Sequence, residues 1–146
     1  MRAELRRALA LDATAIAGIA GESLPEHWGA DAFRAELEAR GGVGFVAVGE
    51  GGAVLGYALA ARADGEIEIR SLAVASAHRR RGLARRLLAA LLESERATGA
   101  SDAFLEVRRS NAAAQRLYAS AGFAPSGERP GYYADGESAI VMAARL

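Results

Sequence analysis

Apolar and polar residues alternate along this chain with two different periods, and the change of period predicts where strands give way to helices. The run Glu66-Ile67-Glu68-Ile69 alternates strictly, which is typical of a strand with one buried face. Leucines spaced three and four residues apart between positions 83 and 92 have the period of a helix with one apolar face. We therefore predict a strand over residues 66–75 and then a helix over residues 80–98, which Gly99 ends.

Weaker periodicities and turn residues predict the remaining elements. Further strands are predicted over residues 2–9, 43–49, 53–61, 102–107 and 138–144. Further helices are predicted after the N-caps Asp12 (residues 13–22), Asp31 (ending at Gly41-Gly42) and either Ser110 or Asn111 (ending at Ala121, before Gly122). A strand that is followed by a helix and a second strand forms a parallel, right-handed crossover. The fold class is therefore α+β, with a mixed, mostly antiparallel sheet around a central strand–helix–strand crossover.

The composition narrows the class of protein. The chain has 146 residues with 18 basic and 18 acidic side chains, and this zero net charge does not favour nucleic-acid binding. It has no cysteine, and His27 and His78 lie too far apart to predict a metal site. No apolar run is long enough to cross a membrane, and the N-terminus lacks the apolar core of a signal peptide. We expect one domain over residues 1–146, a cytoplasmic monomer that needs no metal and binds no membrane.

A basic run lies where the predicted strand 66–75 meets the predicted long helix. It reads Arg79-Arg80-Arg81-Gly82-Leu83-Ala84-Arg85. A helix start offers unpaired backbone N–H groups and the positive end of the helix dipole, and small residues such as Gly82 and Ala84 let an anion approach closely. Because arginines have the wrong sign for this end of the dipole, the run favours a bound anion over a solvated basic surface, which is the alternative. Neither a P-loop nor a dinucleotide-binding fingerprint is present.

A carboxylate further along the chain is a candidate for proton transfer. Glu106 follows Phe104 and Leu105 at the end of an apolar strand, so we expect its side chain to be partly buried at the edge of the sheet. The alternative is a surface glutamate that pairs with Arg108 or Arg109.

The helix after this strand contributes a phenol. Asn111, Gln115 and Tyr118 are spaced four and three residues apart, so they share one helix face. The alternative for Tyr118 is an aromatic residue at the edge of the core whose hydroxyl reaches water. An anion cradle, a carboxylate and a phenol together are suited to moving an acyl group from a phosphate-bearing carrier to an amine.

Taken together, these motifs resemble the GNAT acyltransferase superfamily and, within it, the RimI-type family, which acetylates the N-terminal amine of a small-subunit ribosomal protein. The resemblance covers most of the chain and is strongest from Leu72 onward. The superfamily's acyl-CoA signature is similar to Arg80-Arg81-Gly82-Leu83-Ala84, in which Ala84 stands where many members have glycine. The narrower RimI-type features are Leu105-Glu106-Val107-Arg108, Ser110-Asn111-Ala112-Ala113-Ala114, Leu117-Tyr118 with Gly122-Phe123, and Arg129-Pro130-Gly131-Tyr132-Tyr133.

The resemblance implies acetyl-CoA as the co-substrate and assigns a role to each matching residue. The implied cofactor-binding residues are Leu72, Ala73 and Val74 for the pantetheine arm, Arg80, Arg81, Gly82, Leu83, Ala84 and Arg85 for the pyrophosphate, and Asn111. Glu106 is implied as the general base and Tyr118 as the general acid. Glu68 is a rival base, since other members of the superfamily carry their base on the equivalent strand.

The resemblance to the RimI type implies a protein N-terminus, that of a ribosomal protein, as the acceptor. A small-molecule amine or a lysine side chain is the alternative acceptor, and an acyl-CoA-binding regulator without activity is the alternative function. We expect residues 24–28, Tyr132 and Tyr133 to wall the acceptor site, although they do not identify the acceptor.

Overall fold

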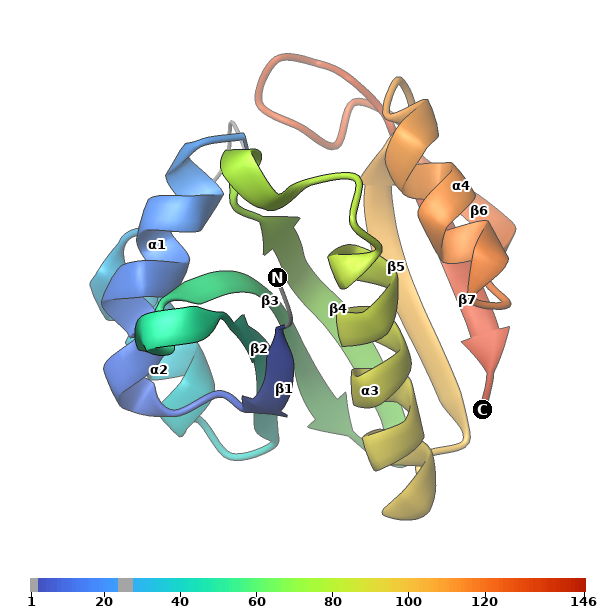
Figure 1. Cartoon of the computed structure of the whole chain (residues 1–146). Coiled ribbons are helices and arrows are strands. Elements are labelled where there is room, and N and C mark those ends of the chain that lie inside the picture. Colours follow the sequence, from blue (N-terminus) through green and yellow to red (C-terminus); the bar gives the residue numbers. More distant parts are fainter. Residues whose placement is uncertain (1–2, 24–27) are drawn as a thin grey trace.

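The computed structural model describes residues 3–23 and 28–146, and in this part of the chain seven strands form one sheet in the order β1-β2-β3-β4-β5-β7-β6 (Figure 1). The strands are β1 (Glu4–Arg7), β2 (Gly42–Val48), β3 (Val54–Ala63), β4 (Glu66–Val74), β5 (Asp102–Arg108), β6 (Ala124–Arg129) and β7 (Ala139–Arg145). The α-helices are α1 (Ala13–Gly21), α2 (Ala30–Glu38), α3 (Leu83–Ala97) and α4 (Ala112–Ser120), and short 3-10 turns are η1 (Ala10–Asp12), η2 (Glu50–Gly52) and η3 (Ser76–His78). Only β4 and β5 pair in parallel, and α3 connects them, so the predicted α+β class and central crossover are confirmed.

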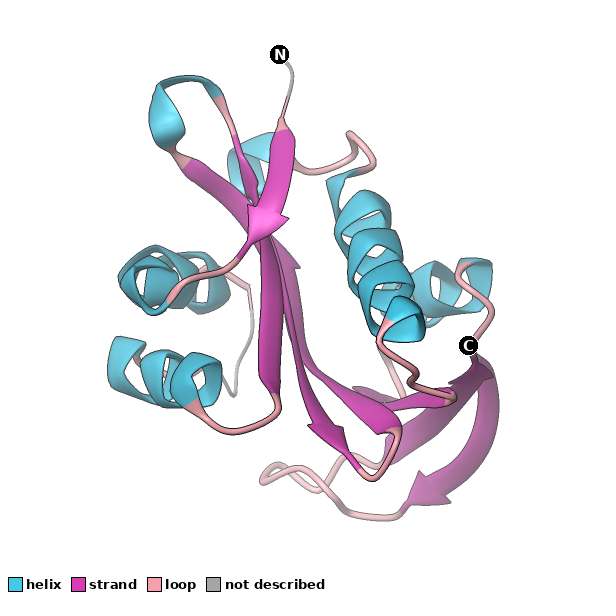
Figure 2. Cartoon of the chain, turned by 90° about the horizontal axis from the view of Figure 1, so that it is seen from below, coloured by secondary structure: helices cyan, strands magenta, loops and turns pink. Residues whose placement is uncertain are grey.

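The helices cover both faces of the sheet, and each face has its own apolar core (Figure 2). On one face, α3 buries Leu83, Leu87, Leu88 and Leu91 against strand residues that include Ile67, Ile69 and Leu105. On the other face, α1 and α2 bury Ile16, Ile19 and Phe33 against Val46 and Tyr57. Each fully buried leucine or isoleucine stabilises the fold by roughly 1.5–3 kcal/mol relative to an exposed one.

A β-bulge in β4 changes which residues face α3. The pairing with β3 joins Leu59 to Ser71 and Ala60 to Ile69. Arg70 is therefore the extra residue of the bulge. Ile69 packs in the α3 core, and Leu72 and Val74 return to that core three and five residues later, whereas an uninterrupted strand would turn them to the other face. The bulge therefore turns Leu72 and Val74, at the end of β4, toward the core that α3 covers.

The parallel pairing of β4 with β5 is short, and this opens the sheet. The paired residues are Glu66 with Asp102, Ile67 with Ala103, and Glu68 with Phe104. Beyond this point β4 continues to Val74 and β5 to Arg108 without pairing with each other, and the two strands diverge (Figure 1). We call the space between the diverging strand ends the β4–β5 split.

Of two predicted helix caps, Asp12 is correct in position only and Asp31 is wrong. The carboxylate of Asp12 accepts a hydrogen bond from the backbone N–H of Leu9 at 2.7 Å and pairs with Arg6 at 2.9 Å. Asp12 is the N-cap residue of α1, but its side chain closes the turn η1 and makes no cap hydrogen bond to α1. Asp31 is the second residue of α2, whose N-cap is Gly29, so its charge interacts with the helix dipole without a cap hydrogen bond.

The long helix also begins later than its periodicity predicts. It starts at Leu83 instead of residue 80, because Arg80 and Gly82 have φ angles of +63° and +77°. These left-handed conformations turn the chain from η3 into α3 and keep Arg79, Arg80 and Arg81 out of the helix. The first strand is likewise shorter than predicted, covering Glu4–Arg7 of the expected residues 2–9.

Candidate active site

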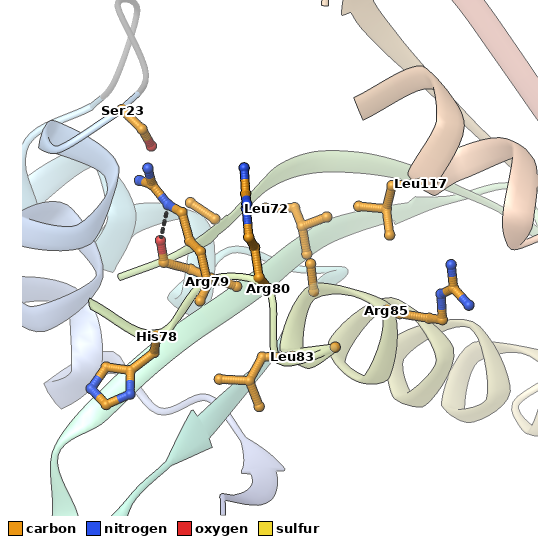
Figure 3. A pocket seen from close by; sticks show the side chains of 12 residues that line it. Ser23, Leu72, His78, Arg79, Arg80, Leu83, Arg85 and Leu117 are labelled. Atoms are coloured by element: carbon orange, nitrogen blue, oxygen red, sulfur yellow. Dashed lines mark hydrogen bonds between the residues drawn. The ribbon is translucent and has the colours of Figure 1, made fainter. Parts of the chain in front are cut away.

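A cavity of about 550 Å³ lies where the end of β4 meets the start of α3 (Figure 3). Its lining residues are Ser23, Leu72, Ala73, Val74, His78, Arg79, Arg80, Gly82, Leu83, Ala84, Arg85 and Leu117. Most of them come from one continuous segment, residues 72–85, and Leu117 enters from α4. Because β4 has no partner on its β5 side here, the cavity runs along a free strand edge.

The start of α3 gives one end of this cavity the character of an anion site. The backbone N–H groups of Leu83, Ala84 and Arg85 precede the first intrahelical donor, Arg86, whose N–H bonds the carbonyl oxygen of Gly82 at 3.0 Å. The first turn contains no acidic residue that would neutralise the helix dipole. A Cβ at Gly82 would meet no described atom within 4 Å, so a ligand has room there.

Eight of the ten residues expected to bind the cofactor line the cavity. They are Leu72, Ala73, Val74, Arg80, Gly82, Leu83, Ala84 and Arg85. Arg81 and Asn111 are not among the lining residues. Asn111 instead caps α4, accepting a hydrogen bond from the N–H of Ala114 at 3.0 Å, which decides between the two predicted caps.

Four lining residues were not expected from the sequence. Arg79 belongs to the basic run, but its Nε donates a hydrogen bond to the carbonyl oxygen of Val74 at 3.1 Å (Figure 3). Leu117 could have been expected from the sequence, because it is the neighbour of Tyr118 on α4. Ser23 and His78 have no sequence signal, since the fold alone brings them to the cavity.

Glu106 lies on the face of the sheet opposite α3. Its neighbours Leu105 and Val107 pack in the α3 core, and alternation turns the Glu106 side chain the other way. The side chain is 15% exposed, so the expected partial burial is correct. Its strand, however, lies between β4 and β7, so the expected position at the edge of the sheet is wrong; Glu106 instead borders the β4–β5 split.

Two side chains hold the Glu106 carboxylate. Tyr132, from the segment between β6 and β7, donates its hydroxyl to Oε1 at 3.0 Å, and Arg129 forms an ion pair with Oε2. The alternative partners considered from the sequence bind other groups. Arg108 pairs with Asp135 and Glu137, and Arg109 pairs with Glu128.

Glu68 lies on the same face as Glu106, at the last position where β4 pairs with β5. It accepts a hydrogen bond from Arg70 at 3.1 Å, and Arg70 also pairs with Glu36 at 2.7 Å. The hydrogen bond to Glu106 raises the pKa of Tyr132, and the negative charge of Glu68 adds to this rise. Glu106 and Glu68, the two candidate bases, therefore both raise the pKa of Tyr132.

Tyr118 lies on the opposite, α3 face. It is buried and packs edge-on against Phe123, with ring centroids 5.8 Å apart. Burial raises the pKa of Tyr118 to about 12, and the nearby Tyr57 and Tyr133 contribute to the rise. No hydrogen bond joins its hydroxyl to another described residue, so the group is a protonated phenol with its donor uncommitted.

The expected acceptor wall is only partly described. Leu24, Pro25, Glu26 and His27 lie outside the described residues. Trp28 packs against Phe33 with ring centroids 5.2 Å apart and lies under Arg70. Tyr132 and Tyr133 stack edge-on at 5.1 Å beside Glu106, on the face away from the cavity's arginines.

Comparison with known proteins decides the family. The model of the acetyltransferase (GNAT) family matches residues 13–123, which is well over half of the chain. This chain belongs to the GNAT acetyltransferase family. The N-alpha-acetyltransferase RimI of Mycobacterium tuberculosis is 35% identical over 136 residues, covering 90% of this chain and 80% of that protein.

Two further relatives point the same way. The ribosomal protein bS18-alanine N-acetyltransferase of Haemophilus ducreyi is 39% identical over 97 residues, covering 64% of this chain and 67% of that protein. The crystal structure of the ribosomal-protein-S18-alanine N-acetyltransferase from Escherichia coli superposes with a TM-score of 0.91 at 29% identity, covering 99% of this chain and 94% of that one. The expected resemblance to the GNAT superfamily and its RimI-type members is confirmed, and the chain is a GNAT-type N-acetyltransferase with a single GNAT-fold domain.

Two other features of the described residues bear on partners. Within residues 3–23 and 28–146, no helix combines the length and apolar character needed to cross a membrane. In the same residues, no group of three or more histidine or carboxylate side chains is arranged to hold a metal ion.

Proposed function

We propose that this N-acetyltransferase moves the acetyl group of acetyl-CoA to the N-terminal α-amine of a protein, and that the acceptor is a small-subunit ribosomal protein. The observation that carries the proposal is the β4–β5 split, which has an anion cradle on its α3 face and a held carboxylate on the other. The names of the relatives from Haemophilus ducreyi and Escherichia coli support this acceptor. A ribosomal protein as acceptor places the reaction in the cytoplasm.

The donor enters from the α3 face. The pyrophosphate binds the N–H groups at the start of α3, with Arg80, Arg81 and Arg85 adding charge-assisted contacts. The pantetheine arm hydrogen-bonds to the free edge of β4 along residues 72–74, where a strand partner is missing. Asn111 contacts the cofactor at the start of α4. This arrangement directs the thioester into the split, between Glu106 on one face and Tyr118 on the other.

The acceptor enters from the face that carries Glu106. Its amine attacks the thioester carbon, so a C–N bond forms and the C–S bond breaks, while Glu106 accepts a proton from the amine directly or through one water. A backbone N–H of β4, at Val74, stabilises the tetrahedral oxyanion. An α-amine has a pKa of about 8 against about 10.4 for lysine, so deprotonating it costs roughly 3 kcal/mol less. A modest base such as a carboxylate is therefore adequate for an N-terminal acceptor.

Arg129 occupies the position that this acceptor needs. In the absence of substrate its guanidinium neutralises Glu106, as an arriving ammonium group would. When the acceptor binds, its ammonium group therefore replaces the guanidinium of Arg129 beside Glu106, and the carboxylate is not left buried and unpaired at any stage. Because the Arg129 side chain is 57% exposed, it can swing into solvent when the acceptor binds.

Tyr118 faces the departing thiolate. Full proton transfer from a phenol with a pKa of about 12 to a thiolate with a pKa of about 8.5 is uphill by roughly 5 kcal/mol. Tyr118 therefore stabilises the thiolate mainly by donating a hydrogen bond, and solvent completes the protonation once CoA leaves.

Acetyl transfer to matched peptides tests the proposed acceptor. One set of peptides begins with a free Ala, Ser or Met, and a second set has a blocked N-terminus and one free lysine. We expect transfer to the free N-termini only. Acetylation of the blocked peptides alone would overturn the proposed acceptor in favour of a lysine, and binding of acetyl-CoA without transfer to any amine would indicate a regulator.

A further inference from the structure

The segment between β6 and β7 is fastened to the end of β5 by one arginine. Nη1 of Arg108 lies 2.9 Å from Oδ2 of Asp135 and 2.8 Å from Oε1 of Glu137. The other carboxylate oxygen of Glu137 accepts a hydrogen bond from the N–H of Ser110 at 2.7 Å. The side chains of Arg108 and Glu137 are only 17% and 24% exposed, so their pair is better shielded from solvent than the pair with Asp135, which is 61% exposed.

The same guanidinium lies over the ring of Tyr133, with Cζ 4.1 Å from the ring centroid. This is a close cation–π contact, and the planar guanidinium is the group best suited to it. The backbone N–H of Tyr133 also donates to the carbonyl oxygen of Glu137 at 3.0 Å, so a backbone hydrogen bond joins the residue that carries the ring to one of the two anionic partners. We call Arg108, Tyr133, Asp135 and Glu137 the Arg108 latch.

The Arg108 latch connects to the candidate base through two aromatic rings. Tyr133 supports Tyr132 edge-on at 5.1 Å, with the ring planes 87° apart. Tyr132 in turn donates its hydroxyl to Glu106. The arginine two residues after Glu106 on the same strand thus fixes the aromatic wall beside the carboxylate.

We propose that Arg108 is a positioning residue for the acceptor, holding Tyr133 and Tyr132 in place as the wall beside Glu106 along which the amine enters. Arg108 touches neither substrate and acts through the two tyrosines. This inference rests on the proposed function in one respect, namely that the acceptor enters on the Glu106 face.

A pair of neighbouring arginines supplies a matched experiment. Arg108→Met keeps an unbranched stem of similar length up to the guanidinium but removes the charge and the stacking on Tyr133. Arg109→Met removes an equal charge from the next residue, whose side chain pairs with Glu128 on β6 and is 64% exposed. For Arg108→Met we expect the KM for the acceptor peptide to rise about tenfold while the KM for acetyl-CoA and kcat stay within about twofold. For Arg109→Met we expect all three constants to stay within about twofold.

Two further variants separate positioning from folding. Arg108→Lys keeps the charge but not the planar fork, so it should recover part of the acceptor KM. Glu137→Gln weakens the Arg108 latch from the other side and should raise the same constant about threefold, which tests the proposal even if Arg108→Met does not fold. Equal effects on the KM for both substrates, or none on either, would overturn the proposal.

Hydrogen exchange of residues 131–137, measured by mass spectrometry without substrates, keeps this test independent of the acceptor's identity. We expect faster exchange in Arg108→Met than in Arg109→Met. If the wild type acetylates only lysines or small amines, the proposed acceptor is wrong but the exchange difference should remain. If exchange is unchanged, the Arg108 latch does not hold the segment and the inference is wrong.

Discussion

The two faces of the β4–β5 split are built in different ways. The donor face comes mostly from one continuous segment, residues 72–85, and offers mainly backbone groups and the end of a helix. The acceptor face is assembled from side chains that are far apart in sequence: Glu106 on β5 is bound by Arg129 at the end of β6 and by Tyr132 from the segment that follows it.

This difference has a functional consequence. Backbone N–H groups fixed by a helix and a strand are arranged before the ligand arrives, so the donor site requires little rearrangement. On the acceptor face Arg129 forms an ion pair with Glu106, and under the proposed mechanism this pair must open before an amine reaches the carboxylate. Affinity for the donor should therefore depend on backbone conformation. Affinity for the acceptor should depend on how readily its ammonium group replaces Arg129 beside Glu106.

The largest expected effect distinguishes the two carboxylates on the acceptor face. Glu106→Gln should lower kcat by about 10²- to 10⁴-fold, since it removes the proposed general base. Glu68→Gln should change kcat by no more than about threefold. The variant that lacks the true base also loses the acidic limb of the pH–rate profile. Loss of that limb in Glu68→Gln instead would transfer the role to the rival carboxylate.

The next largest effect concerns the phenol on the donor face. Tyr118→Phe should lower kcat between about 10-fold and about 100-fold and leave the KM for acetyl-CoA nearly unchanged, because the lost hydrogen bond forms only to the developing thiolate. With the pKa of Tyr118 raised to about 12, the wild-type profile should show no alkaline fall due to this group below about pH 11.

A second buried tyrosine is the control for this prediction. Tyr57, whose hydroxyl lies 2.7 Å from that of Ser71, also has its pKa raised by burial to about 12. Tyr57→Phe should cost about 1 kcal/mol of stability and retain kcat. An unchanged kcat in Tyr118→Phe removes that residue from the mechanism.

A smaller effect tests the backbone of the donor face. Gly82→Ala places a side chain at a φ of +77° and adds a methyl group where the phosphates should approach. We expect the Kd for acetyl-CoA to rise about tenfold, by calorimetry. Gly99, at the other end of α3, has a φ of +103° and equally open surroundings, so Gly99→Ala should lose similar stability but keep donor affinity. A similar rise in the Kd for acetyl-CoA in both variants would contradict the proposed anion site at the start of α3.

The smallest effect tests charge exchange on the acceptor face. An ion pair as exposed as that of Arg129 contributes at most about 1 kcal/mol, so Arg129→Gln should lower the KM for the acceptor peptide by up to about fivefold. The KM for acetyl-CoA should not change. A higher acceptor KM in this variant would show that Arg129 binds the acceptor instead of competing with it.

What the sequence predicts well is the donor face, because its determinants are local. The alternation at Glu66–Ile69, the leucine period of α3 and the glycine at position 82 all lie within one segment and together predict the strand, the helix and the anion cradle. The parallel crossover follows from the order of these elements. Asn111 as the cap of α4 was one of two predicted possibilities, and its short side chain suits the position.

What the sequence did not predict depends on distant partners. Asp12 is the N-cap residue of α1 as predicted, yet its side chain binds Arg6, and no local pattern in the sequence indicates that pair. The bulge at Arg70 interrupts an apparently regular strand because residues of β3 determine the register. The partners of Glu106 and the Arg108 latch come from segments about 20–30 residues away in sequence, so only the fold brings them together.

One measurement tests the separation of the two faces most directly. Acetyl-CoA is titrated by calorimetry into wild type and Glu106→Gln, and peptide acetylation is measured on the same preparations. We predict an unchanged Kd for acetyl-CoA together with a fall in turnover of at least about 100-fold. A Kd weakened in proportion to turnover, or turnover retained in Glu106→Gln, would contradict it.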